Sequence, residues 1–187
     1  DSSNANDGYG SNTWSTSSLN TYLNNEFITT FDETTKGKIE KTTWKVGGNT
    51  SSNIENKPAK AAYQNEVVKP VPGSTSSNGE TEHPAKIGLM YASDYGFAAA
   101  PSAWTTKLSS YDAKAIKNAN WMYLGAIEWT ISRHANYAYG AFNVRDSGYL
   151  FNSNVDLACG VRPVFYLTSS VNYASGSGTA ADPISIN

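Results

Sequence analysis

The most constraining feature of the sequence is a series of short apolar segments, separated by turn residues, between residues 121 and 171. Segments of about four to eight residues bounded by turns are typical of strands rather than helices. The sequence Asp146–Ser147–Gly148 is typical of a tight hairpin turn. The pattern predicts a small antiparallel sheet, with strands at 127–132, 140–145, 148–151 and 161–167.

An amphipathic helix is predicted before this sheet, because apolar side chains recur mainly at helical spacing from Leu19 to Phe31. Ser15 or Thr16 is the expected N-cap of this helix. A second short helix is expected within 101–117. The predicted fold class is therefore α+β.

The length of 187 residues suits one domain. Residues 1–13 are polar and are predicted to form a flexible N-terminal segment, which leaves 14–187 as the domain. Residues 47–86 are rich in Ser, Asn, Gly and Pro, so we expect a loop-rich insertion there, with a short strand or a turn of helix at 61–68.

Composition limits the partners of the chain. Its 14 basic residues are scattered among 16 acidic ones, which argues against a nucleic-acid partner. No apolar run approaches the roughly 18 residues of a membrane helix, so no direct membrane insertion is expected. A single cysteine, Cys159, excludes an internal disulfide or a CxxC site, and it is expected to be a small buried residue. Few cysteines, low charge and abundant Ser, Thr, Asn and Tyr predict an extracellular or cell-surface location.

Several motifs in order resemble one bacterial family, the domain of exported surface proteins and pilin-like proteins of Gram-positive-type bacteria. That domain is related in fold to the C-type-lectin and formylglycine-generating-enzyme group. The resemblance implies a C-type-lectin-like fold, with one or two helices on a small twisted antiparallel sheet and ligand-facing loops within 133–160. Val161 stands where that fold usually has an aromatic residue. The motifs are SSLNTYLNNEF, KIGLMYASDYGFA, WTISR, GVRPVFYLTSSV and SGSGTAADPISI.

No catalytic residue, cofactor or metal is predicted. The enzymatic relatives implied by the resemblance bind copper through two cysteines or iron through three histidines, whereas this chain has one cysteine and only His83 and His134. A GxSxG motif is absent, which weakens a Ser–His–Asp hypothesis. A structural ion at Asn152, Asn154 and Asp156 is conceivable, but a polar turn explains this sequence better.

Two charged residues in apolar strands need an explanation. Glu128 lies between Ile127 and Trp129, and we expect it to face solvent or to pair with an arginine such as Arg133 or Arg145. Arg162 is expected to hold a buried carboxylate, for which the candidates are Asp94 and Asp156.

The strongest functional signal is a stretch in which tyrosine and asparagine alternate with small residues. These two residue types supply amphipathic area and adaptable hydrogen bonds, so the stretch is predicted to bind a protein or glycan. In the alternative interpretation, the tyrosines cover the sheet and the asparagines serve turns. The predicted function is a non-catalytic extracellular binding or adhesion domain, the exposed head of a pilin-like or other cell-surface protein, and its further partners would be identical or pilin-like subunits. A purely structural pilus subunit is the alternative, and an oxidase or hydrolase is a weaker one. The predicted ligand-binding residues are Asn136, Tyr137, Tyr139, Asn143, Tyr149, Asn152 and Asn154.

Overall fold

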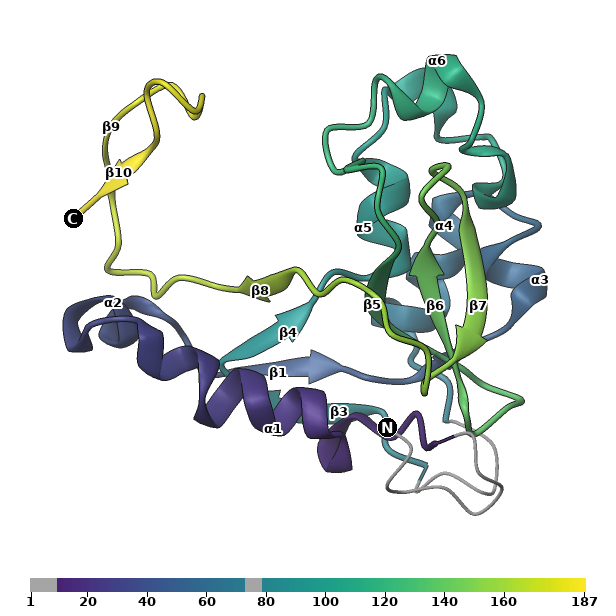
Figure 1. Cartoon of the computed structure of the whole chain (residues 1–187), viewed down its shortest axis with the longest axis horizontal. Coiled ribbons are helices and arrows are strands. Elements are labelled where there is room, and N and C mark those ends of the chain that lie inside the picture. The colour runs from purple at the N-terminus through teal and green to yellow at the C-terminus, as the bar shows by residue number, and fades with distance from the viewer. Residues whose placement is uncertain (1–9, 73–78) are drawn as a thin grey trace.

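The computed structural model describes residues 10–72 and 79–187, in which short helices accompany small, mostly antiparallel sheets (Figure 1). This combination agrees with the predicted α+β class. The α-helices are α1 (Ser18–Asn25), α2 (Glu33–Lys38), α3 (Ser51–Ile54), α4 (Ala59–Tyr63), α5 (Ala92–Phe97) and α6 (Lys114–Lys117). The other helical turns are η2 (Trp14–Thr16), η3 (Phe27–Thr30), the π-helical η4 (Gln64–Val68), η5 (Pro101–Ala103) and η6 (Leu108–Ser110).

The largest sheet has four strands in the order β2-β5-β6-β7, and β2 runs parallel to β5 while the other pairs are antiparallel. Three two-stranded pairs, β1-β3, β4-β8 and β9-β10, complete the described part. The strands are β1 (Thr42–Lys45), β2 (Gly48–Asn49), β3 (Glu82–Ala85), β4 (Ile87–Leu89), β5 (Glu128–His134), β6 (Gly140–Val144), β7 (Leu150–Asn154), β8 (Pro163–Phe165), β9 (Tyr173–Ser175) and β10 (Ser185–Ile186). The predicted turn at 146–148 is confirmed, since Gly148 has φ 105° and donates its N–H to Arg145 O at 2.8 Å.

Strand β5 is buried along its whole length and separates two cores. Because strand side chains alternate between faces, Trp129 and Ile131 join the core under α1. On the other side of the strand, the His134 ring stacks on Phe142, which belongs to the core that packs against α3, α4 and α5. Thr130 Oγ1 donates to Phe142 O at 2.8 Å. Strand β5 is therefore buried on both faces, although only Trp129 and Ile131 of its residues are apolar.

Helix α1 is shorter than its apolar pattern predicts, and it continues as η3. Its cap is Ser17, not Ser15 or Thr16, because Ser17 Oγ accepts the N–H of Asn20 at 3.0 Å. Asn24 attaches the helix to β4, since its amide accepts the N–H of Ile87 at 3.0 Å and donates to Ile87 O at 2.9 Å.

Two predicted loop segments are partly wrong. Within 1–13, residues 1–9 lie outside the described residues, but Asn12 and Thr13 are buried rather than flexible. Within 47–86, residues 73–78 lie outside the described residues, whereas Ser51–Val68 is largely helical. Ile54 of this segment reaches the core, and Thr50 caps its first helix by accepting the N–H of Asn53. Polar residues here cap short helices, which the composition alone did not reveal.

The β9-β10 hairpin projects away from the rest of the chain (Figure 1). Its turn requires glycine at Gly176, because φ is 98° and a Cβ there would lie 2.0 Å from Pro183 O. Its residues Tyr173 and Ile184 are exposed.

Candidate functional site

The predicted tyrosines lie in the connection between β5 and β6, residues 135–139, which we call the tyrosine loop. Tyr137 is 50% exposed, and its ring stacks on that of Tyr139 with centroids 5.9 Å apart and planes at 23°. The ring centroid of Tyr137 also lies 4.5 Å from that of His134. The structure therefore brings two of the predicted residues together as a partly exposed aromatic pair.

Asn12 anchors this loop from the interior. Its Nδ2 lies 3.0 Å from His134 O, 2.8 Å from Tyr137 O and 2.8 Å from Gly140 O. Its backbone N–H donates to Ala138 O at 2.6 Å. Four contacts from one buried residue hold the loop in a single conformation, and sequence reasoning missed them because Asn12 was assigned to the flexible segment.

His134 supports the loop as a neutral ring. Its Nδ1 accepts the N–H of Asn136 at 3.1 Å, so the hydrogen lies on Nε2, which donates to Ser51 Oγ at 3.2 Å. Burial lowers the pKa of His134, which favours this uncharged form. With its lone pair occupied, the ring in this arrangement does not accept the hydroxyl proton of Ser51.

The predicted asparagines differ in exposure and in hydrogen bonding. Asn143 does not lie at the surface, because it is 0% exposed, and its amide atoms make no hydrogen bond within the described residues. Asn152 donates to Ser51 Oγ at 3.1 Å and to Glu55 Oε1 at 2.8 Å, so its amide joins β7 to α3. Asn136 is exposed, and Asn154 is partly buried.

Tyr149 lies away from the tyrosine loop, beyond the turn that joins β6 to β7. It is partly buried and packs edge-on against the exposed Phe151, with ring centroids 6.2 Å apart. The seven predicted residues therefore do not form one surface, and the tyrosine loop is the part that remains accessible.

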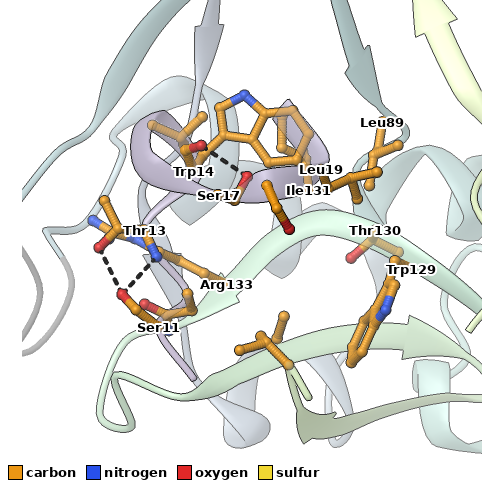
Figure 2. Close-up of a pocket in the computed structure, with 15 residues that line it drawn as sticks. Ser11, Thr13, Trp14, Ser17, Leu19, Leu89, Trp129, Thr130, Ile131 and Arg133 are labelled. Atoms are coloured by element: carbon orange, nitrogen blue, oxygen red, sulfur yellow. Dashed lines mark hydrogen bonds between the residues drawn. The ribbon is translucent and has the colours of Figure 1, made fainter. Parts of the chain in front are cut away.

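A cavity of about 150 Å³ lies between the N-terminal turn, α1 and β5 (Figure 2). The indole rings of Trp14 and Trp129 and the side chains of Leu19, Leu89 and Ile131 form most of its apolar wall. Ser11, Thr13 and Arg133 line its other end. A dry cavity of about this volume can hold a benzene-sized group.

Arg133, which lines this cavity, is a buried cation with few hydrogen bonds. It is 2% exposed, and its Nη2 donates to Glu80 O, while Nε and Nη1 have no partner among the described residues. Burial lowers the pKa of Arg133, and the charge of Glu80 opposes this shift. Because Nε and Nη1 are themselves shielded, a ligand would reach them only if the cavity wall moved.

The remaining buried acids have protein partners. Glu128 accepts hydrogen bonds from Arg162 Nε at 3.2 Å and Nη2 at 2.5 Å, so it pairs with an arginine as expected, although neither with Arg133 nor with Arg145. The candidates Asp94 and Asp156 for Arg162 were wrong. Glu66 accepts the Ser132 hydroxyl and the N–H of Ser93 at 3.1 Å, and burial raises its pKa. Within 10–72 and 79–187, no group of three or more His, Cys, Asp and Glu side chains is placed to hold a metal ion.

Comparison with known proteins identifies the family. Residues 1–169 match a family described as a domain of unknown function, DUF6273. The chain belongs to the DUF6273 family. No curated protein and no solved structure matches the chain. The match ends before the β9-β10 hairpin of this DUF6273 member, and no helix in its described part is long and apolar enough to cross a membrane.

Proposed function

We propose that this DUF6273 chain is a non-catalytic binding or adhesion domain with a C-type-lectin-like fold. The proposed location is the cell surface, where the domain is the exposed head of a pilin-like protein. The observation that carries the proposal is the stacked pair of Tyr137 and Tyr139 on a loop fixed by Asn12. The ligand class is a protein or glycan at the cell surface.

Preorganisation is the physical reason for choosing this loop. Binding through a mobile loop costs the entropy of ordering it, whereas a loop already fixed by buried hydrogen bonds avoids that cost. Tyrosine adds contact area with few rotatable bonds and a hydroxyl that can donate or accept. The accessible half of Tyr137 therefore offers contact area that needs little further ordering.

The environments of His134 and Glu128 favour binding over catalysis by these two residues. The lone pair of the His134 ring is occupied by a backbone N–H, and Glu128 is paired with Arg162. A general base needs a free lone pair within reach of the proton that it removes.

The test is a binding assay on a printed glycan array and on immobilised extracellular matrix proteins. We expect the chain to bind at least one probe, and Tyr137→Ala and Tyr139→Ala each to weaken that binding at least tenfold. Tyr22→Ala is the matched control, because Tyr22 is 49% exposed on α1 and belongs to neither the loop nor its anchors. Unchanged binding by both loop variants would remove the tyrosine loop from the proposal.

A purely structural surface subunit is the second candidate, and the projecting β9-β10 hairpin favours it. The hairpin exposes Tyr173 and Ile184, which are apolar enough to pack against an identical subunit. If this candidate is correct, Tyr173→Ser and Ile184→Ser will each lower self-association in sedimentation velocity. Tyr137 will then be buried from solvent between subunits of the assembly.

A further inference from the structure

A groove lies at the other end of the β5-β6-β7 sheet, outside the tyrosine loop and the cavity. Its volume is about 440 Å³, and its apolar wall includes Met90, Met122 and Val164. Phe97 and Trp121 also line it. Arg162 also lines the groove and binds Glu128, which pairs with Val144 at the end of β6. The tyrosine loop precedes Gly140, at the start of β6, so the two sites lie at opposite ends of this strand.

Trp121 is the most exposed tryptophan of the described part, at 77%. Its indole N–H makes no hydrogen bond within that part, although its backbone N–H donates to Ala98 O at 3.4 Å. The side chain therefore contributes little to the core, while its flat face and its donor remain available beside the groove. Large exposed aromatic side chains around a hollow are characteristic of binding surfaces.

The aromatic surface extends beyond the groove. Phe97 packs edge-on against Tyr63, with centroids 6.3 Å apart, and against Trp104, with centroids 5.6 Å apart. All three rings are partly exposed. The indole N–H of Trp104 donates to Ala99 O at 2.9 Å, which fixes that ring. A row of aromatic rings that pack against one another next to the groove suits a ligand with repeated units rather than one small molecule.

The groove also offers one unused acceptor and one unused donor. Asp94 Oδ2 accepts the N–H of Tyr91 at 2.9 Å, and its Oδ1 has no hydrogen bond within the described residues. Arg162 uses Nε and Nη2 for Glu128 and Met122 O, while its Nη1 is similarly unused in the described part. Glu128 offsets the guanidinium charge, and Asp94 disfavours an anionic polymer.

We infer that this groove and its aromatic row bind a neutral polysaccharide chain. A sugar ring has apolar C–H faces that pack on aromatic rings and hydroxyl groups that both donate and accept. Trp121 and Phe97 supply the stacking faces, and Asp94 Oδ1 and Arg162 Nη1 supply the polar contacts. Neighbouring sugar units continue over Trp104 or Tyr63. The site is independent of the tyrosine loop.

The experiment is affinity electrophoresis of the whole chain in native gels that contain hydroxyethyl cellulose, xylan, galactomannan or laminarin. We expect at least one of these neutral polymers to retard the chain. Trp121→Ala is expected to raise the dissociation constant at least tenfold, and Trp121→Tyr, which keeps a flat ring, to raise it less. Leu124→Ala is the matched control, because Leu124 is exposed three residues away and does not line the groove.

The loop variant Tyr137→Ala separates this inference from the proposed function, because it is expected to leave the retardation unchanged. The inference is overturned if no neutral polymer retards the chain, or if Trp121→Ala and the wild type are retarded equally. It is also overturned if only heparin, an anionic polymer, retards the chain. If no polysaccharide binds and Trp121→Ala abolishes binding of the chain to an immobilised protein, the groove recognises proteins instead.

Discussion

The two ends of the β5-β6-β7 sheet differ in which polar groups are left without a protein partner. At the loop end, the amide nitrogens of Asn12 and Asn152 and the ring of His134 make hydrogen bonds inside the protein. At the groove end, Asp94 Oδ1 and Arg162 Nη1 have no hydrogen bond within the described residues, and Trp121 is exposed. A wealth of hydrogen-bonding residues in a sequence does not reveal whether those groups are available to a ligand.

This difference predicts where substitutions affect stability and where they affect binding. Loop-end substitutions at the anchors should unfold or loosen the structure. Groove-end substitutions at the exposed rings should change binding with little change in stability.

The largest expected effect is that of Asn12→Ala. The change leaves three carbonyl oxygens without the amide that they contact, so the free energy of unfolding should fall by about 2–4 kcal/mol. Urea denaturation measures this loss, and Asn118→Ala, at an exposed position, should stay within about 0.5 kcal/mol of the wild type. An equal effect of the two changes would show that Asn12 does not anchor the loop.

Arg162→Met tests the ion pair between Arg162 and Glu128 at the groove end. It leaves Glu128 buried and unpaired, and partial exposure of Arg162 limits the expected loss of stability to about 2 kcal/mol. Adding Glu128→Gln in the same chain should recover part of the loss. If the double variant is no more stable than Arg162→Met, the unpaired charge is not the cause.

The pH dependence of stability should separate the loop end from the rest. Burial lowers the folded-state pKa of His134, so its contribution is complete above the ordinary value of 6.5 and decreases as pH falls below it. Glu66 acts in the opposite direction, because its raised pKa favours the folded state at low pH and this contribution is lost as pH rises above 4.5.

Urea midpoints between pH 8 and pH 5, measured for the wild type and His134→Gln, isolate the histidine contribution. The wild type should lose more stability than His134→Gln on acidification, since Gln does not titrate. Parallel curves for the two proteins would mean that His134 titrates as it does in the unfolded chain.

The smallest expected change in stability is that of Trp121→Ala. Because the side chain is mostly in solvent, the free energy of unfolding should change by no more than about 0.5 kcal/mol. Thermal and urea denaturation both measure it. A loss of several kcal/mol would place Trp121 in the core and remove the distinction between the two ends.

Local features of the fold were predictable from the sequence. The turn at 146–148 depends on neighbouring residues, and strand β6 lies within the predicted 140–145 segment. Helix α3 (Ser51–Ile54) was missed, because short helices capped by Ser and Thr resemble loops in composition and gain stability from packing.

The contacts that define the candidate sites were less predictable, because they join residues far apart in the chain. Asn12 contacts a loop more than 120 residues away, and Arg162 meets Glu128 across 34 positions. A single sequence does not specify such pairs. The exposure of Trp121 was equally unpredictable from the sequence, since an aromatic residue in an apolar segment is usually assigned to the core.

Hydrogen exchange, followed by mass spectrometry with and without the retarding polysaccharide, tests most directly whether the two ends are separate. The account predicts slower exchange in peptides covering 94–104 and 120–124, with residues 134–140 unchanged. Protection confined to 134–140 would contradict it, because the ligand would then bind the tyrosine loop and leave the aromatic groove empty.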